Sequence, residues 1–198
     1  MMSSWIRGWI EYVLDYFGLA QKRGRILLLG LDNAGKTTLM HVLKEGSISA
    51  HVPTHHATSE EFTLGDIRLT LFDVGGHAQV RRVWRDYLPL ADAIVFIVDC
   101  ADHGRLEEAR AELWGLLNES LIAGDCPVLV LGNKIDREGA ISEEMLKEVL
   151  GISQICTGKI AADPAGFRPV EVFMCSVTRS SGIGAGFRWL TKYLADQR

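Results

Sequence analysis

The stretch Gly30-Leu-Asp-Asn-Ala-Gly-Lys-Thr37 decides the fold of this chain. It fits G-x-x-x-x-G-K-[ST], the pattern of a glycine-rich loop whose backbone N–H groups surround phosphate groups. The continuous apolar run before it, residues 25–31, predicts a strand buried on both faces. Residues 36–45 after it have a helical pattern. A turn followed by an ordinary surface lysine would give the same letters, but the strand and helix on either side favour a phosphate loop.

The residue types in this loop suit a polyphosphate. Gly30 and Gly35 allow the chain to wrap tightly and to approach the ligand closely. Lys36 can neutralise the β- and γ-phosphates, and the Thr37 hydroxyl is an oxygen ligand of the kind that Mg²⁺ prefers. The motif indicates a nucleoside triphosphate but not its base. We expect the nucleotide to contact Asp32, Asn33, Ala34, Gly35, Lys36, Thr37 and Thr38.

The rest of the chain alternates strand and helix patterns. Further strands are expected at residues 60–64, 68–72, 93–99, 128–132 and 171–176, and helices at 105–123, from Ser142 onward, and at 184–196. Repeated βα units predict an α/β fold with a mostly parallel six-stranded sheet and helices on both faces. Residues 151–169 carry Gly and Pro without clear periodicity, so we interpret them as a surface insertion or long loop.

Composition excludes several classes of protein. The 198 residues are 47% hydrophobic and 23% charged, which excludes a disordered or collagen-like chain. Lys and Arg number 21 against 25 Asp and Glu, a net charge of −4, so we expect no nucleic acid partner held by bulk charge. No apolar run reaches the roughly 18–20 residues that span a bilayer. The four Cys are widely separated, which favours reduced thiols and a cytosolic compartment over disulfides.

A second motif, Asp73-Val-Gly-Gly76, follows the strand at residues 68–72. An Asp at a strand end, facing the phosphate loop, suits a contact to Mg²⁺ through a water molecule or through another group bound to the ion. The N–H of Gly76 can donate to the γ-phosphate. Alone this pattern is weak, because Asp-Gly clusters are mostly turns.

A third motif, Asn133-Lys-Ile-Asp136, follows the strand at residues 128–132. The Asp136 carboxylate can accept hydrogen bonds from guanine N1–H and N2–H₂, whereas adenine offers no such donor pair. Lys134 can lie over the base plane, and Asn133 can tie the loops together. Ser176 and Val177 follow the last strand, where the Val177 N–H can reach guanine O6. A solvated loop of mixed charge is the alternative reading of this motif alone.

Together these motifs resemble the small GTPase family over nearly the whole chain, and the details resemble the Sar subgroup of the Arf family. The stretches that carry the resemblance are GLDNAGKTT at 30–38, PTHHATSE at 53–60, DVGGH at 73–77, RRVW at 81–84, VDCAD at 98–102 and VFMCSV at 172–177. The resemblance implies a three-layer P-loop GTPase fold, bound GTP or GDP, Mg²⁺ and GTP hydrolysis. It also implies assembly of the COPII coat, with a membrane-bound exchange factor and an activating inner coat subunit as partners. One departure is Ala57, where the family often has Pro.

The same resemblance implies roles for further residues. Thr54 is expected to reach Mg²⁺ only in the triphosphate state, with Thr58 as a second candidate, so the metal set is Thr37, Thr54 and Asp73. His77 stands where many GTPases carry a Gln that orients the attacking water, and a neutral imidazole can hold that water. A lone His is otherwise usually a surface or core residue.

Arginine and aspartate side chains near these motifs are harder to assign. No Arg is clearly placed as an internal arginine finger, so intrinsic turnover should be slow. Arg81, Arg82 and Arg85 are interpreted as a solvated or partner-binding helix face. Asp32 is expected near the nucleotide or a Mg²⁺-bound water.

The first twenty residues form an amphipathic pattern. Its apolar face, the predicted membrane contact, is Trp5, Ile6, Trp9, Ile10, Val13 and Phe17. Two Trp at one end suit the bilayer interface. Met2 in place of Gly excludes N-myristoylation. We therefore divide the chain into a membrane-binding helix at 1–20 and a GTPase domain at 21–198; a helix docked on the core is the alternative.

The resemblance places the protein in the cytosol, recruited to the cytosolic face of the endoplasmic reticulum, its exit sites and Golgi-bound vesicles, with endoplasmic reticulum lipids as partners. An Arf-like GTPase on another membrane is the main alternative. A small-molecule kinase should lack Asn133-Lys134-x-Asp136. A module that holds GTP without hydrolysing it remains a third class.

Overall fold

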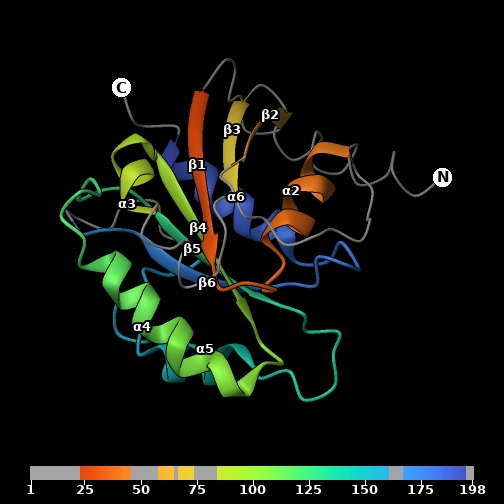
Figure 1. Ribbon diagram of the computed structural model, residues 1–198. Coiled ribbons are helices and arrows are strands. Elements are labelled where there is room, and N and C mark those ends of the chain that lie inside the picture. Colours follow the sequence, from red (N-terminus) through yellow and green to blue (C-terminus); the bar gives the residue numbers. More distant parts are fainter. Residues whose placement is uncertain (1–22, 46–57, 65–66, 74–83, 161–166, 195–198) are drawn as a thin grey trace.

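The computed structural model describes residues 23–45, 58–64, 67–73, 84–160 and 167–194 (Figure 1). The strands in these residues are β1 (Arg23–Gly30), β2 (Thr58–Leu64), β3 (Ile67–Asp73), β4 (Ala93–Asp99), β5 (Val128–Asn133) and β6 (Val170–Met174). The helices are α2 (Lys36–Glu45), α3 (Trp84–Tyr87), α4 (Leu106–Leu117), α5 (Glu143–Leu150) and α6 (Ile183–Leu194), with short 3₁₀ turns η2 (Leu88–Leu90) and η3 (His103–Arg105).

The six strands form one sheet in the order β2-β3-β1-β4-β5-β6. All neighbouring pairs are parallel except β2 and β3, which are antiparallel. The predicted α/β class and the mostly parallel six-stranded sheet are therefore confirmed. Because β1 has β3 on one side and β4 on the other, the chain leaves β1 at a switch point of the strand order, where open α/β sheets bind ligands.

Helices cover both faces of the sheet (Figure 1). The two faces of β1 belong to two separate hydrophobic cores. Ile26 and Leu28 pack with α2 and α6, whereas Leu27 and Leu29 pack with α3, α4 and α5. This explains why residues 25–31 are continuously apolar: both sides of the strand are buried, and burial of this apolar surface stabilises the three-layer fold.

Two element ends differ from the expectation. Helix α4 ends at Leu117, not at residue 123, and the Arg168 guanidinium donates to the carbonyl of Leu117 at 3.2 Å. The same guanidinium also reaches the carbonyls of Ile122 and Ala123, so a distant side chain supports the irregular chain after the helix. Strand β6 ends at Met174, and Ser176 instead forms an antiparallel bridge with Ser181.

Other expectations hold in the described residues. Helix α5 starts after Ser142, whose hydroxyl accepts from the Met145 N–H at 3.2 Å. Residues 151–160 and 167–169 contain no helix or strand, as expected for a long loop. All four Cys are free thiols. No helix of the described chain is long and apolar enough to cross a membrane. The predicted helix at 1–20 and residues 195–196 lie outside the described residues.

Candidate nucleotide site

The phosphate loop begins where β1 ends, and two glycines shape it. Gly30 has φ 137° and Gly35 has φ 109°, conformations that side chains rarely adopt. A Cβ at Gly30 would collide with the Ile97 carbonyl oxygen of β4, and a Cβ at Gly35 would collide with the Asn133 side-chain amide. Both positions therefore require glycine for conformation and for space.

Lys36 holds the first part of this loop. Its side chain is buried, with a residue exposure of 6%, and its ammonium donates to the carbonyls of Gly30 at 3.0 Å and Leu31 at 2.9 Å. Lys36 is the first residue of α2, so the helix N-terminus and the ammonium stand at the same place. Both contribute positive charge at the start of α2.

The next three carbonyls of the loop are held by donors from other elements. Arg105 reaches the Asp32 carbonyl at 3.4 Å, Lys134 the Asn33 carbonyl at 2.6 Å, and the Asn133 amide the Ala34 carbonyl at 2.8 Å. Side chains thus hold five consecutive carbonyls, those of residues 30–34. Across a trans peptide the following N–H points the opposite way, so this arrangement turns loop N–H groups toward the other side. A concave set of N–H groups is what an anion requires.

Asn133 joins the phosphate loop to the chain after β6. While its amide nitrogen donates to Ala34, its side-chain oxygen accepts from the Val177 N–H at 3.0 Å and from the Cys175 thiol at 3.8 Å. Asn133 is 2% exposed. The predicted tie between the loops is therefore confirmed.

The same contact bears on the expectation for Val177, which stays a prediction. Its N–H was expected to face guanine O6, but in this structure it donates to the Asn133 side chain. The reason is the close approach of the ends of β5 and β6, which are parallel neighbours. A base oxygen would have to share or displace that acceptor.

Asp136 lies beside this tie. Its carboxylate accepts a 2.6 Å hydrogen bond from the Ser176 hydroxyl, which in turn accepts from the Arg179 N–H at 3.2 Å. The Ser176 hydrogen bond lowers the pKa of Asp136, so this group is a carboxylate at neutral pH. A fixed, ionised carboxylate is the acceptor that the guanine donor pair requires.

Lys134 links the same two regions through charge. It has a positive φ of 65°, and its ammonium forms a 2.6 Å ion pair with Asp99 at the end of β4. Together with its contact to Asn33, this places Lys134 over the junction between the phosphate loop and β4.

Thr37 and Thr38, two of the predicted nucleotide ligands, lie in the first turn of α2 and are half-buried. Asp73 ends β3 and pairs in register with Leu28, two residues before the phosphate loop begins. Thr37 and Asp73 are therefore brought to one edge of the sheet, and a hydroxyl and a carboxylate suit Mg²⁺. Thr58, the second candidate for the metal, begins β2 and pairs in register with Asp73. Thr54, Gly76 and His77 lie outside the described residues, as do the six predicted membrane contacts.

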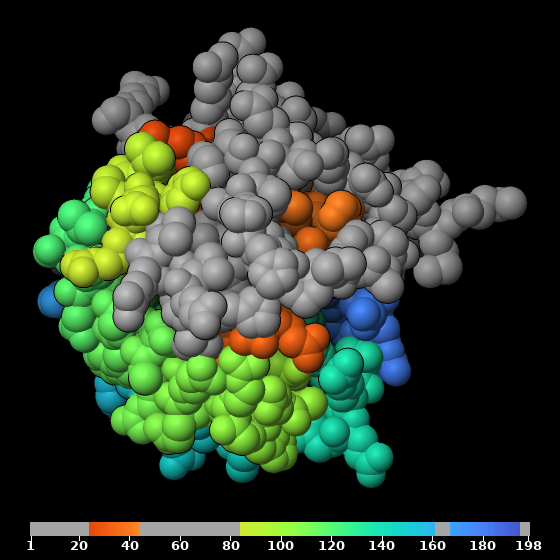
Figure 2. Space-filling view, in the orientation of Figure 1, coloured from red at the N-terminus to blue at the C-terminus, as the bar shows by residue number. Residues whose placement is uncertain are grey.

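One participant has no signal in the sequence. Arg105 lies 73 residues from Asp32, yet its guanidinium binds the Asp32 carboxylate at 2.7 Å. In the space-filling view, the orange part of the chain that carries the loop lies directly against the green part after β4 (Figure 2). Only the β1–β4 pairing brings these segments together, so spacing along the chain could not reveal the contact.

Residues 10–194 match the family model described as the ADP-ribosylation factor family. The chain belongs to the ADP-ribosylation factor family.

Two relatives and one solved structure from this family are similar to the chain. It is 42% identical over 187 residues to the Small COPII coat GTPase SAR1 of Giardia intestinalis, covering 94% of this chain and 97% of that protein. It is 43% identical over 195 residues to the Small COPII coat GTPase SAR1 of Nicotiana tabacum, with the same coverage. The Arl6 BBS3 small GTPase from Trypanosoma brucei, solved with the nucleotide analogue GppNp, is 29% identical, with a TM-score of 0.77 over 89% of this chain and 99% of that one.

These findings agree with the geometry. The fold is that of a small GTPase, and members of this family bind GTP and GDP and hydrolyse GTP. The Arf-family chain is accordingly a GTP-binding enzyme.

Proposed function

We propose that this chain is a small GTPase switch that starts COPII coat assembly for transport from the endoplasmic reticulum to the Golgi. The observation that carries the nucleotide part is the Asn133 side chain, which fastens the phosphate loop to the chain after β6, where the Ser176 hydroxyl donates to Asp136. The coat assignment is supported by the two SAR1 relatives, which match the chain over 94% of its length.

The nucleotide is proposed to lie across the carboxyl ends of the strands. Residues 32–38 and Gly76 would hold the phosphates, whereas Asn133, Lys134 and Asp136 would hold the base, with Ser176 and Val177 supporting it. Preference for guanine follows from the Asp136 carboxylate, because adenine would leave it without donors. The 2.6 Å hydrogen bond from Ser176 supports this by fixing the carboxylate.

A magnesium ion is proposed to accompany the nucleotide. Thr37 and Asp73 fit this role because their elements meet at the carboxyl edge of β1 and β3 and supply hard oxygen atoms. Thr54 would join them in the triphosphate state. When bound, the ion would neutralise charge on the β- and γ-phosphates.

His77 is proposed to orient the water that attacks the γ-phosphate. Arg85, one of the arginines near it in sequence, forms a 2.9 Å ion pair with Glu119 and is thus held on the α4 side. Slow intrinsic hydrolysis would then require an arginine from a partner, which accelerates such reactions by roughly 10³- to 10⁵-fold. The inner COPII coat subunits are the proposed activating partner.

Residues 1–20 are proposed to bind the membrane as an interfacial helix, and residues 21–198 to form the GTPase domain. Strand β1 begins at Arg23, which supports a boundary near residue 20. Endoplasmic reticulum lipids and a membrane-bound exchange factor are the proposed partners, at the cytosolic face of that membrane and its exit sites. The alternative is an Arf-like GTPase on a different membrane, a reading supported by the fold shared with Arl6.

Flotation with liposomes tests this proposal. The full chain and a chain lacking residues 1–20 are each loaded with GDP or a non-hydrolysable GTP analogue and mixed with anionic vesicles, with or without inner COPII coat subunits. We expect only the full chain with the GTP analogue to float and to bring the coat subunits with it. Flotation without recruitment of coat subunits would favour the Arf-like alternative, and equal flotation in both nucleotide states would contradict the switch.

A further inference from the structure

The phosphate loop carries an acidic side chain at a position where a polyphosphate is proposed to bind. Asp32 is the third residue of the loop, and its side chain is 29% exposed. Its carboxylate is negative at neutral pH, as are the phosphates that this loop would hold. Close to a bound nucleotide, such a charge opposes binding unless a cation compensates for it.

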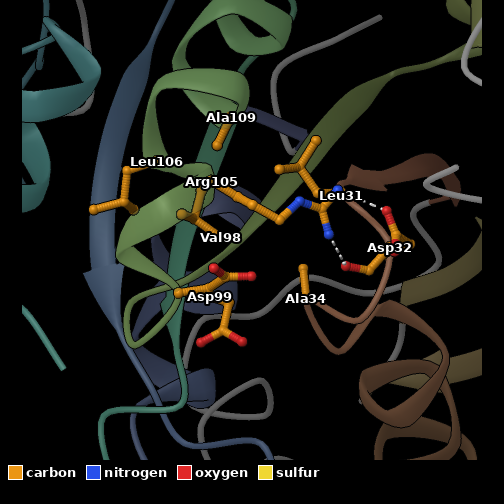
Figure 3. A pocket seen from close by; sticks show the side chains of 9 residues that line it. Leu31, Asp32, Ala34, Val98, Asp99, Arg105, Leu106 and Ala109 are labelled. Atoms are coloured by element: carbon orange, nitrogen blue, oxygen red, sulfur yellow. Dashed lines mark hydrogen bonds and ion pairs between the residues drawn. The ribbon is translucent and has the colours of Figure 1, made fainter. Parts of the chain in front are cut away.

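Arg105 supplies that cation from the turn before α4. One guanidinium nitrogen lies 2.7 Å from the Asp32 carboxylate, and another lies 3.4 Å from the Asp32 carbonyl oxygen. The third nitrogen donates to the Glu108 carboxylate at 2.8 Å, which fixes the guanidinium plane. Figure 3 shows Arg105 extended across the site toward Asp32. One side chain therefore holds both the charge and the backbone of the loop.

The surroundings make this pairing matter. The space between the loop and α4 is a cavity of about 10 Å³, room for about one water molecule, with apolar lining from Leu31, Val98, Leu106 and Ala109 (Figure 3). There is therefore little room for water between Asp32 and α4, although the Asp32 side chain is partly exposed elsewhere. On the α4 side, water could replace the guanidinium as a partner of the carboxylate only in part.

The other charges near the loop are already committed or are also negative. Asp99 and Asp102 line the same cavity. Asp99 is paired with Lys134 at 2.6 Å, and Lys36 donates to the carbonyls of Gly30 and Leu31. Among the described residues, Arg105 is a cation in direct contact with the Asp32 carboxylate. Its hydrogen bonds to Asp32 and then Glu108 raise the pKa of Arg105, so it stays charged.

We infer that Arg105 is a positioning residue that neutralises Asp32 and holds its carboxylate on the α4 side of the phosphate loop, and thereby slows nucleotide release. This inference rests on the proposed function, since it concerns retention of the nucleotide at the same site. It gives the turn between β4 and α4 a part in nucleotide affinity. Movement of that turn would separate Arg105 from Asp32 and weaken binding of the nucleotide phosphates by the phosphate loop.

The test measures dissociation of a fluorescent GDP analogue from the full chain in the presence of Mg²⁺. Arg105→Met removes the cation, and we expect dissociation to become about tenfold faster, as expected for one uncompensated charge near the phosphates. Arg110→Met is the matched control, because Arg110 lies on α4, directly after the turn that carries Arg105, and pairs with exposed Glu107 at 3.6 Å. We expect it to release nucleotide at the wild-type rate. Arg105→Lys keeps the charge and should stay within about threefold of wild type.

A double variant separates charge compensation from simple structural support. Asp32→Asn added to Arg105→Met removes the uncompensated charge, so the fast dissociation should return most of the way to the wild-type rate. If Arg105 were only a structural tie, the double variant would release nucleotide as fast as Arg105→Met, and the inference would be overturned. An Arg105→Met rate equal to that of wild type would also overturn it. A wild-type chain that fails to bind the GDP analogue would instead refute the proposed function, so the two failures are distinguishable. Circular dichroism melting of each variant checks folding. If Arg105→Met does not fold, Arg105→Gln, which also removes the charge, carries the test with the same expected and contradicting rates.

Discussion

At the scale of single residues, the Asn133 side chain joins two separate segments of this site. Its amide group holds the Ala34 carbonyl in the phosphate loop and the Val177 N–H after β6, from a position that is 2% exposed. The sequence could predict that Asn133 ties loops together, because its place in the Asn-Lys-x-Asp motif follows a buried strand. It could not predict the partner at Val177, since that depends on how closely β5 and β6 end.

Replacing Asn133 tests this role directly. Asn133→Ala would leave the buried Ala34 carbonyl and Val177 N–H without their partners, and each such group costs about 1–3 kcal/mol. We expect a drop of that order in the free energy of unfolding, measured by urea denaturation without nucleotide. Asn118→Ala is the control, because Asn118 is exposed and bonds only within its own helix end to Trp114. A loss no larger than that of the control would contradict the role.

At the scale of elements, the long loop after α5 is held by a buried carboxylate. The Glu171 side chain on β6 is 2% exposed, pairs with Lys147 of α5 at 2.9 Å, and accepts from the Gly158 N–H at 2.8 Å. The Gly158 carbonyl in turn accepts from the Trp189 indole of α6 at 3.1 Å. The loop is thus fastened to three elements although it contains no helix or strand of its own among its described residues.

We predict that Glu171→Ala lowers the free energy of unfolding by about 1–3 kcal/mol, because it removes the acceptor of the buried Val172 N–H, while Lys147 keeps its other partner Glu143. Urea denaturation monitored by Trp fluorescence measures this change. The exposed Glu138→Ala serves as control and should change stability by less than about 0.5 kcal/mol. If Glu171→Ala unfolds at the same urea concentration as the control, the loop is not held by this carboxylate.

The ends of elements show where sequence reasoning stops. The start of α5 is predictable, because Ser142 and the acidic first turn are local signals. The end of α4 is not, since Arg168 supports the carbonyls after it from 51 residues away. The same limit explains why Asp32 could be placed near the nucleotide but its partner Arg105 could not. Signals between residues close in sequence can be predicted from the sequence. Contacts between residues that only the order of the strands brings together can be found only in the structure.

At the scale of the whole molecule, the two cores on either side of the sheet bury three thiols almost completely. Burial raises the pKa of Cys100, Cys126 and Cys175 to about 12, from about 9 for an ordinary thiol. The folded chain therefore keeps protons that the unfolded chain loses above about pH 9. Because the folded pKa is the higher one, this contribution to stability is complete below pH 9 and is lost as the pH rises toward 12.

We predict that the free energy of unfolding falls above pH 9 by up to about 1.4 kcal/mol per pH unit for each of these thiols. Urea denaturation at pH 8, 9 and 10 measures the slope. Cys175→Ala should reduce that slope by about a quarter, because burial also raises the pKa of Cys156, to about 11, so four thiols contribute. A free energy of unfolding that is constant or rises between pH 9 and 10 would show that these thiols do not titrate as buried groups.

The global architecture was the most predictable feature. Apolar runs at residues 25–31, 93–99 and 128–132 correspond to β1, β4 and β5, each of which has one face in each hydrophobic core. The phosphate-loop motif identifies the first of these strands as the one that leads into the nucleotide site. The order of the strands in the sheet could not be predicted, because the spacing of motifs along the chain does not show on which side of β1 each later strand lies. That order brings five strand ends, those of β1, β3, β4, β5 and β6, together at the nucleotide site.

The nucleotide site should bind guanine nucleotide and hydrolyse GTP, and a single-turnover hydrolysis experiment measures both properties. The full chain, in molar excess over radiolabelled GTP or ATP, is incubated with Mg²⁺, and the release of phosphate is followed over time. We predict slow hydrolysis of GTP and almost none of ATP. Asp136→Asn should lower the preference for GTP binding by roughly 10- to 100-fold, and His77→Gly should bind GTP but hydrolyse it more slowly. Equal use of ATP and GTP by the wild-type chain, or no phosphate release from either, would contradict the account.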